Sequence, residues 1–482
     1  MKNELHLGAA EAGQGNPLGY LPIGRLLLSF SVPSVISMLV NAVYNIVDQI
    51  FIGQGVGELG NAATTVSFPV ATIILAFATL IGSGGSAYAA LKMGEGKHEE
   101  ANRTLNNVFI LSLGAGVLIL ALGLLFLEPM LRAFGAGPEV MPYAKDYASI
   151  LLIGAPFNIM GITLSNMART DGNPKLSMYG ILVGAVLNTI LDPIYIFVFH
   201  WGVKGAAVAT ITSQMISAVI LLVYFTRHSK HMRFRLSLMK PAGSICGKVV
   251  TLGVSSGITQ TVAVVMQIVM NNSLAHYGAL SEVGDVTAQA AMGIVTKIAM
   301  ILLAFCIGIG IGAQPILGFN RGARQFQRVK GTYLRAVLAA TVAVGVGWLL
   351  CQSIPHLILK IFGEASATFT AFAVRCMRTY LFGIFCAGFQ VVSTNYFQAT
   401  GQPLKASLLS MLRQLLLLIP LLLILPLFWG LDGILYAGPI ADISSGVIVA
   451  LFVIPEMKKL ERQVREEDAG LAGQQPQMSP AE

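Results

Sequence analysis

The sequence predicts an all-α, polytopic membrane protein with twelve transmembrane helices in two six-helix, parallel-repeat lobes. Hydrophobic residues make up 55% of the 482 residues and charged residues only 11%, whereas a soluble domain has about 25% charged residues. The chain also contains enough long apolar stretches for twelve spans of about 20 residues each. Landmarks of the first half recur in the second half, which predicts a duplicated architecture.

The repeat rests on several landmarks in the same order. Gly172-Asn173-Pro174 recurs as Gly401-Gln402-Pro403, and Trp201-Gly202 recurs as Trp429-Gly430, at spacings of 229 and 228 residues. Gly82 recurs as Gly308 at a spacing of 226. Six spans per half return the chain to its starting side, so the halves are expected to be parallel repeats. In secondary transporters with such repeats, the substrate site lies where the repeats meet.

The apolar stretches place each element along the chain. An N-terminal tail (1–25) precedes an N-lobe (26–226), a linker (227–248), a C-lobe (249–456) and a charged C-terminal tail (457–482), which we expect to be frayed. The expected spans are 26–52, 63–90, 105–127, 147–168, 176–199, 205–226, 249–275, 287–318, 334–354, 379–399, 406–428 and 433–454.

The net charge of +8 reflects topology and does not indicate a nucleic-acid partner. Most Lys and Arg residues fall on one side when both termini are placed in the cytoplasm, which is the positive-inside pattern. We therefore expect a multi-pass protein of the cytoplasmic (inner) membrane. No Walker A, GxSxG or HExxH motif is present, and the five cysteines show no zinc spacing. We expect a secondary transporter, with no enzymatic activity and no cofactor, that is driven by an ion gradient.

Polar side chains inside the spans are candidates for an ion site. Helical spacing puts Asn41, Asn45 and Asp48 on one face of span 1, and Asn188 and Asp192 on one face of span 5. Two interpretations are open: hydrogen bonds between helices, or a site for a proton or a small hard cation, which prefers oxygen donors. The polar residues of span 6 at the same kind of spacing are Thr210, Ser213 and Gln214.

At these residues the chain resembles the multidrug and toxic compound extrusion (MATE) family. The resemblance rests on residues 47–53 (VDQIFIG), residues 169–174 (RTDGNP), the pair Asn188 and Asp192, and residues 202–207 leading to Thr210. It implies two six-helix lobes around a central cavity and drug efflux driven by entry of H+ or Na+. It also implies Asp48, Asn188, Asp192 and Thr210 as the ion-coupling residues, with a possible Na+ site. Spans 7 and 10 lack the acids of the NorM-like branch, so the chain is more similar to the DinF and MepA branch.

The remaining polar and flexible residues of the spans give weaker expectations. Lys297 is open to two interpretations, a structural counter-ion, which we favour, or a cation in the cavity. Arg413 is expected to pair with Asp442, and the GxxxG of Gly308 and Gly312 is expected to pack helices closely. The candidate cavity-lining residues are Met38, Tyr44, Met160, Met266, Met270 and Lys297.

The leading function is therefore an antiporter that exports amphipathic, often cationic compounds by alternating access of the two lobes. The alternative is a flippase for a lipid-linked sugar or another amphiphile, and a passive channel is disfavoured. The expected partners are small molecules and the lipid bilayer, without nucleic acid. A monomer suffices, because one chain supplies both lobes.

Overall fold

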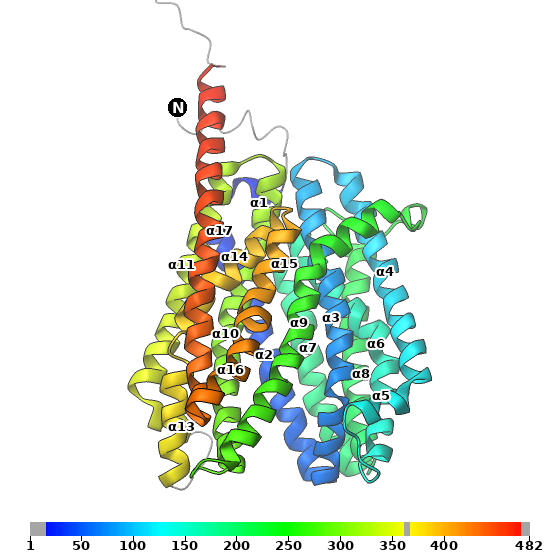
Figure 1. Cartoon of the computed structure of the whole chain (residues 1–482). Coiled ribbons are helices and arrows are strands. Elements are labelled where there is room, and N and C mark those ends of the chain that lie inside the picture. The colour runs from blue at the N-terminus through cyan, green and yellow to red at the C-terminus, as the bar shows by residue number, and fades with distance from the viewer. Residues whose placement is uncertain (1–15, 361–366, 474–482) are drawn as a thin grey trace, which may run out of the picture.

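The computed structural model describes residues 16–360 and 367–473, and all the regular structure in those residues is helical (Figure 1). Short π-helical turns lie at Ile194–Val198, Tyr224–His228 and Leu412–Leu418, and 3-10 turns at Leu236–Leu238 and Ile384–Cys386. The α-helices are α1 (Pro17–Tyr20), α2 (Ile23–Val56), α3 (Glu58–Gly94), α4 (His98–Leu125), α5 (Leu127–Ala133), α6 (Met141–Thr170), α7 (Pro174–Pro193), α8 (Gly202–Val223), α9 (Gly243–Ala279), α10 (Asp285–Gly322), α11 (Phe326–Ser353), α12 (Pro355–Lys360), α13 (Ala367–Tyr380), α14 (Ala387–Ala399), α15 (Pro403–Met411), α16 (Ile419–Trp429) and α17 (Leu431–Gly473).

The described residues contain eleven membrane-length apolar helices and one bent pair that together make up to twelve spans. This confirms the predicted all-helical fold. Span 10 differs from the single helix expected over 379–399, because α13 and the segment that continues into α14 meet at 41°. A Cβ on Gly383, at the break, would lie 2.9 Å from the Cα of Pro439 in α17. The break therefore lies where a neighbouring helix approaches its backbone.

Each half of the chain buries its own apolar core. The N-lobe core draws on α3, α4, α6 and α8, and the C-lobe core draws on α9, α10, α11, α14 and α17. The two cores also exchange residues: Leu27 of α2 is buried in the C-lobe core, and Ile316 and Phe319 of α10 are buried in the N-lobe core. The lobes are thus joined by packing as well as by the chain.

The lobes meet closely toward the end of the molecule where α1 begins and α17 ends, here called the termini face (Figure 1). A Cβ on Gly253 of α9 would lie 1.8 Å from the carbonyl oxygen of Leu80 in α3, and one on Gly94 of α3 would lie 1.9 Å from that of Phe319 in α10. A Cβ on Gly308 would lie 2.6 Å from the Cα of Val35 in α2. Only glycine permits such backbone contact. We call these contacts the inter-lobe seam, and they confirm the packing role expected for Gly308.

The recurrent Gly-x-Pro sequence forms equivalent turns in the two lobes. Gly172 and Gly401 both have positive φ, 86° and 79°, and a proline at the first position of the next helix follows each of them. Asp171, just before the first turn, is fully buried. It accepts hydrogen bonds from the Tyr224 hydroxyl (2.7 Å) and from the backbone N–H groups of residues 230, 231 and 232 (2.9, 2.9 and 2.8 Å). The linker is therefore anchored to the N-lobe by one carboxylate.

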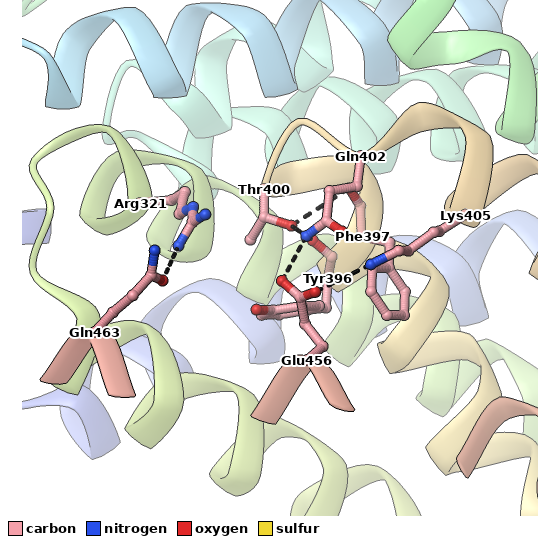
Figure 2. A network of polar contacts seen from close by, with 8 residues as sticks. All are labelled: Arg321, Tyr396, Phe397, Thr400, Gln402, Lys405, Glu456 and Gln463. Atoms are coloured by element: carbon pink, nitrogen blue, oxygen red, sulfur yellow. Dashed lines mark hydrogen bonds and ion pairs between the residues drawn. The ribbon is translucent and has the colours of Figure 1, made fainter. Parts of the chain in front are cut away.

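The C-lobe has a matching anchor in which the acid comes from α17 (Figure 2). Glu456 accepts hydrogen bonds from the side chains of Gln402 (2.7 Å) and Lys405 (3.1 Å), which flank the second turn. Farther along α17, Gln463 accepts one from Arg321 of α10 at 2.9 Å. The expectation of a frayed tail after Met457 is wrong as far as residue 473, because α17 continues that far. Residues 1–15 of the predicted N-terminal tail and 474–482 of the C-terminal tail lie outside the described residues.

Candidate ion and substrate site

Three helices of the N-lobe bring the predicted acid cluster together. Asp48 comes from α2, Asn188 and Asp192 come from successive turns of α7, and Thr210 comes from α8. The Asn188 side-chain amide donates to Asp192 Oδ1 at 3.2 Å and to Thr210 Oγ1 at 3.3 Å. The carboxyl groups of Asp48 and Asp192 lie close enough to influence each other directly. All four residues are thus in one cluster, although they are far apart in the sequence.

Local sequence explains how α7 presents its two members. Asp192 lies four positions after Asn188, so both side chains lie on one helix face. Pro193 follows directly, and its missing N–H removes one helical hydrogen bond. A π-helical turn, Ile194–Val198, begins there. Such turns occur mostly as single irregularities in helices, often at functional sites.

The cluster contains buried oxygen atoms without a hydrogen-bond donor. Asp48 Oδ1, Asn188 Oδ1 and Asp192 Oδ2 are buried and make no hydrogen bond within the described part of the chain. Buried polar atoms are normally satisfied, and each exception calls for an explanation such as a bound ion. Two carboxyl groups in contact cannot both stay ionised without a compensating positive charge. The arrangement fits a proton or a small cation such as Na+, for which oxygen is the preferred ligand.

Two tyrosines complete the surroundings of the acids. Tyr44 of α2, which the sequence suggested only as a cavity residue, and Tyr147 of α6 both lie close enough to interact electrostatically with Asp48 and Asp192. Tyr147 is 8% exposed and packs with Ile52. Sequence reasoning missed Tyr147, because its span carries no polar pattern that points at α2.

The supporting polar residues lie at different places. Asn41 and Asn45 are exposed and bonded to each other, with Asn45 Nδ2 donating to Asn41 Oδ1 at 2.9 Å. Ser213 is buried and donates to the carbonyl of Ala209 in its own helix at 2.8 Å. Gln214 is half-buried. The pair Asn41 and Asn45 lies on the same helix as Asp48, whereas Ser213 serves α8 itself.

The C-lobe has no equivalent of the acid cluster. At the repeat spacings of 226, 229 and 228 residues, Asp48, Asp192 and Thr210 correspond to Leu274, Leu421 and Gly438. The duplication therefore preserved the helices but not the acids.

In place of the cluster, the C-lobe carries an ion pair. Arg413 Nε donates to Asp442 Oδ1, which confirms the predicted pair. Asp442 is 3% exposed. The repeat-related positions in the N-lobe are Gly184 and Gln214, so the N-lobe has no charge at this place.

The structure corrects part of the predicted cavity lining. Met160 and Met270 are only 7% and 3% exposed and lie in the cores of the N-lobe and the C-lobe, because apolar side chains on these helix faces fill the space between helices. Met38, Tyr44 and Met266 are half-buried. Lys297 is exposed, and no acidic side chain of the described residues lies within ion-pair distance of it. The counter-ion role favoured for Lys297 is therefore wrong.

The lobes part beyond the inter-lobe seam. An apolar cavity of about 300 Å³ lies between α3 and α9, lined by Ala76 and Leu80 on one side and by Gly257 and Thr261 on the other. Farther from the termini face, residues of α2, α9 and α10 such as Gln49, Asn271 and Lys297 are exposed. The two lobes are thus closed toward the termini face.

Comparison with known proteins identifies the family. The MatE family model matches residues 33–194 and 256–424, most of the chain. The chain belongs to the MATE family. It is therefore a multi-pass membrane transporter of the secondary type, and the resemblance drawn from its motifs is confirmed.

The MATE relatives cover almost the whole chain. The multidrug export protein MepA of Staphylococcus aureus (strain MRSA252) is 26% identical over 437 residues, which is 90% of this chain and 94% of MepA. The structure of the MATE multidrug transporter DinF-BH has a TM-score of 0.84 and 32% identity, over 92% of this chain and 97% of DinF-BH. An outward-facing MATE transporter of the MOP superfamily has a TM-score of 0.86 and 23% identity, over 94% and 99% of the two chains; at that identity it shows the fold alone.

Proposed function

We propose that this MATE protein is an H+- or Na+-coupled antiporter that exports amphipathic, often cationic compounds, with its coupling site in the N-lobe. The observation that carries the proposal is the acid cluster, where three buried oxygen atoms of Asp48, Asn188 and Asp192 make no hydrogen bond within the described residues. The names of MepA and DinF-BH, both multidrug transporters, support drugs as the substrate class.

The orientation follows from charge. The linker, which carries Arg227, Lys230 and Arg233, lies toward the termini face, and positive segments stay in the cytoplasm. With both termini in the cytoplasm, the inter-lobe seam closes the inner side and the parted lobes face outward. The described state is then the one that releases drug and takes up the coupling ion.

Coupling requires that the ion and the drug favour different states. An ion entering from outside would occupy the oxygens of Asp48, Asn188 and Asp192 and remove the repulsion between the two carboxylates. The half-buried position of Asp48 on α2 places that change on a helix that also packs against the C-lobe through Leu27 and Val35. A change in the packing of α2 would therefore alter its contacts with the C-lobe.

The test is dye movement in proteoliposomes that carry either a proton gradient or a sodium gradient. Ethidium serves as the cationic dye, and Asp48→Asn is compared with the wild type. We expect one gradient to drive the wild type, naming the ion, and Asp48→Asn to lose gradient-driven transport while still binding dye. Asp146→Asn, which removes a partly exposed acid that pairs with Lys204, is the matched control and should transport normally.

Two results would contradict the proposal. Gradient-driven transport that survives in Asp48→Asn would remove the N-lobe coupling site. Failure of both gradients to move the dye with the wild type would remove drug antiport itself, and the flippase alternative would then be tested with a labelled lipid-linked sugar.

A further inference from the structure

Lys297 is a positive charge about one third of the way along α10 that the proposed coupling site does not use. It is exposed and has no acidic partner among the described residues, unlike Arg413, which pairs with Asp442. A charged side chain within a membrane-spanning helix is costly, and such residues normally face a water-filled cavity or the bundle interior. The direction in which Lys297 points therefore decides what it does.

Helix geometry places Lys297 on the side of α10 that faces the N-lobe. Residues 297, 308 and 319 are spaced eleven apart, which is close to three helical turns, so they share one stripe. Gly308 meets α2, and Phe319 meets Gly94 of α3, whereas Val295 and Ile298 are buried in the C-lobe core. Lys297 continues the stripe past the point where the lobes part. Its side chain is therefore exposed on the wall of the C-lobe that faces the N-lobe.

An amide pair lies on the same wall. Gln267 Nε2 of α9 donates to Asn271 Oδ1 at 3.0 Å. Asn271 is eighteen residues beyond Gly253, which is five helical turns, and Gly253 contacts Leu80 of α3. Asn271 therefore also faces the N-lobe.

Lys297 and Gln267 lie at the same depth on neighbouring helices. α9 and α10 are antiparallel neighbours joined by a short connection, across which Gly278 approaches Asp285. Gln267 and Lys297 are each fifteen residues from Glu282, in the middle of that connection, so they lie at the same depth. We call Gln267, Asn271 and Lys297 the C-lobe polar patch.

The repeat shows that the lysine is an addition to this patch. At the spacing of 226 residues, Gln267 and Asn271 correspond to Asn41 and Asn45, which are also hydrogen-bonded to each other. Lys297 corresponds to Ala71, which packs in the small cluster around Ile52. Both lobes thus carry an amide pair at this place, but only the C-lobe adds a cation, and the acids belong to the N-lobe.

We propose that the C-lobe polar patch binds the carboxylate of amphipathic substrates, an inference that rests on the proposed drug-export function. Lys297 supplies the charge, and the amides of Gln267 and Asn271 supply further N–H donors. An ammonium group binds an anion as a compact point charge with three donors. The transporter then accepts carboxylate-bearing amphiphiles as well as plain cations, and Lys297 distinguishes them.

The test compares two dyes that differ in one group, rhodamine B with a free carboxylate and its ethyl ester without one. Binding to the purified full-length protein is measured by fluorescence anisotropy at neutral pH. We expect Lys297→Met to weaken rhodamine B binding about tenfold, close to the loss of one charged contact, and to leave the ester within about twofold. Lys297→Arg should retain rhodamine B binding, and Lys97→Met, which removes an exposed lysine near the termini face, should change neither.

Unchanged rhodamine B binding by Lys297→Met, with normal ester binding, would overturn this inference alone. An equal loss for both dyes would also overturn it, because it would assign Lys297 a structural role. Binding of neither dye by the wild type would contradict the drug-export proposal and this inference together.

Discussion

At the residue scale, the two lobes handle buried charge in opposite ways. In the N-lobe, Asp48 and Asp192 face each other without a basic partner among the described residues. In the C-lobe, Asp442 is neutralised by Arg413. A carboxyl pair responds to the arrival of a cation or proton, whereas a paired acid does not. The asymmetry supports our proposal that the coupling ion acts in the N-lobe, whereas the ion pair of the C-lobe is structural.

The ion pair predicts an unequal outcome for single and double substitutions. Arg413→Met should destabilise the protein strongly, by about 3–5 kcal/mol, because it leaves Asp442 charged and buried. Arg413→Met combined with Asp442→Leu should recover most of that stability, since both charges are gone. Thermal unfolding in detergent measures both variants. Equal destabilisation by the single and the double variant would contradict the expected recovery. A double variant whose loss equals the sum of the losses of Arg413→Met and Asp442→Leu would show that the pair carries no coupling energy.

At the element scale, helix ends and turns are held by single acidic side chains. Asp171 holds the linker by accepting from three backbone N–H groups, and Glu456 holds the second Gly-x-Pro turn against α17 (Figure 2). The same turn sequence is thus anchored by an acid from the turn in one lobe and by an acid from the last helix in the other. The second turn also lies near the inter-lobe seam, because a Cβ on Gly401 would lie 3.5 Å from the side chain of Leu91 in α3.

The linker anchor can be tested by proteolysis. Asp171→Ala should free the linker, because each buried N–H that loses its acceptor costs about 1–3 kcal/mol. We expect faster trypsin cleavage at Lys230, Arg233 and Lys240, and a lower melting temperature. Asp171→Asn keeps one acceptor oxygen and should give an intermediate rate. Cleavage at the wild-type rate in Asp171→Ala would mean that other contacts, such as those from Asn102 and Asn107, hold the linker alone.

At the scale of the whole molecule, glycines bring the backbones of the two lobes into contact near the termini face. Backbone meets backbone at Gly253 and at Gly94, so the lobes close only if no side chain lies between them. The seam joins α3 to α9, α2 to α10 and α3 to α10. The repeat relates α2 to α9 and α3 to α10, so it converts the first pair into the second and the third pair into itself. The contact near the termini face is therefore built from equivalent helices of the two lobes.

The seam predicts a conformational effect of one methyl group. Gly253→Ala would place a Cβ 1.8 Å from the Leu80 oxygen, so we expect the lobes to separate at the termini face and efflux to fall about tenfold, as about 1.4 kcal/mol of bias would produce. Electron paramagnetic resonance distances between spin labels at Lys97→Cys and Gln327→Cys, in a variant without the five native cysteines, should lengthen. Gly247→Ala, on the same helix with open space around it, is the control. Unchanged distances in Gly253→Ala would show that the seam accommodates the added methyl group without separation of the lobes.

The class, the helices and most of the proposed coupling site were readable from the chain alone. Apolar length sets the number of spans because each must satisfy its backbone within the bilayer. Helical spacing placed Asn188 with Asp192, and the motif resemblance added Asp48 and Thr210. The repeat spacing by itself indicates the two halves of the molecule.

What lies between the helices became visible only in three dimensions. The fold brought Tyr147 to the acids and buried Met160 and Met270 within the lobes. Span 10 is bent where α17 packs against it. Lys297 has no counter-ion among the described residues. One helix sequence states which residues share a face but not which neighbour that face meets, because the choice depends on packing among all the helices.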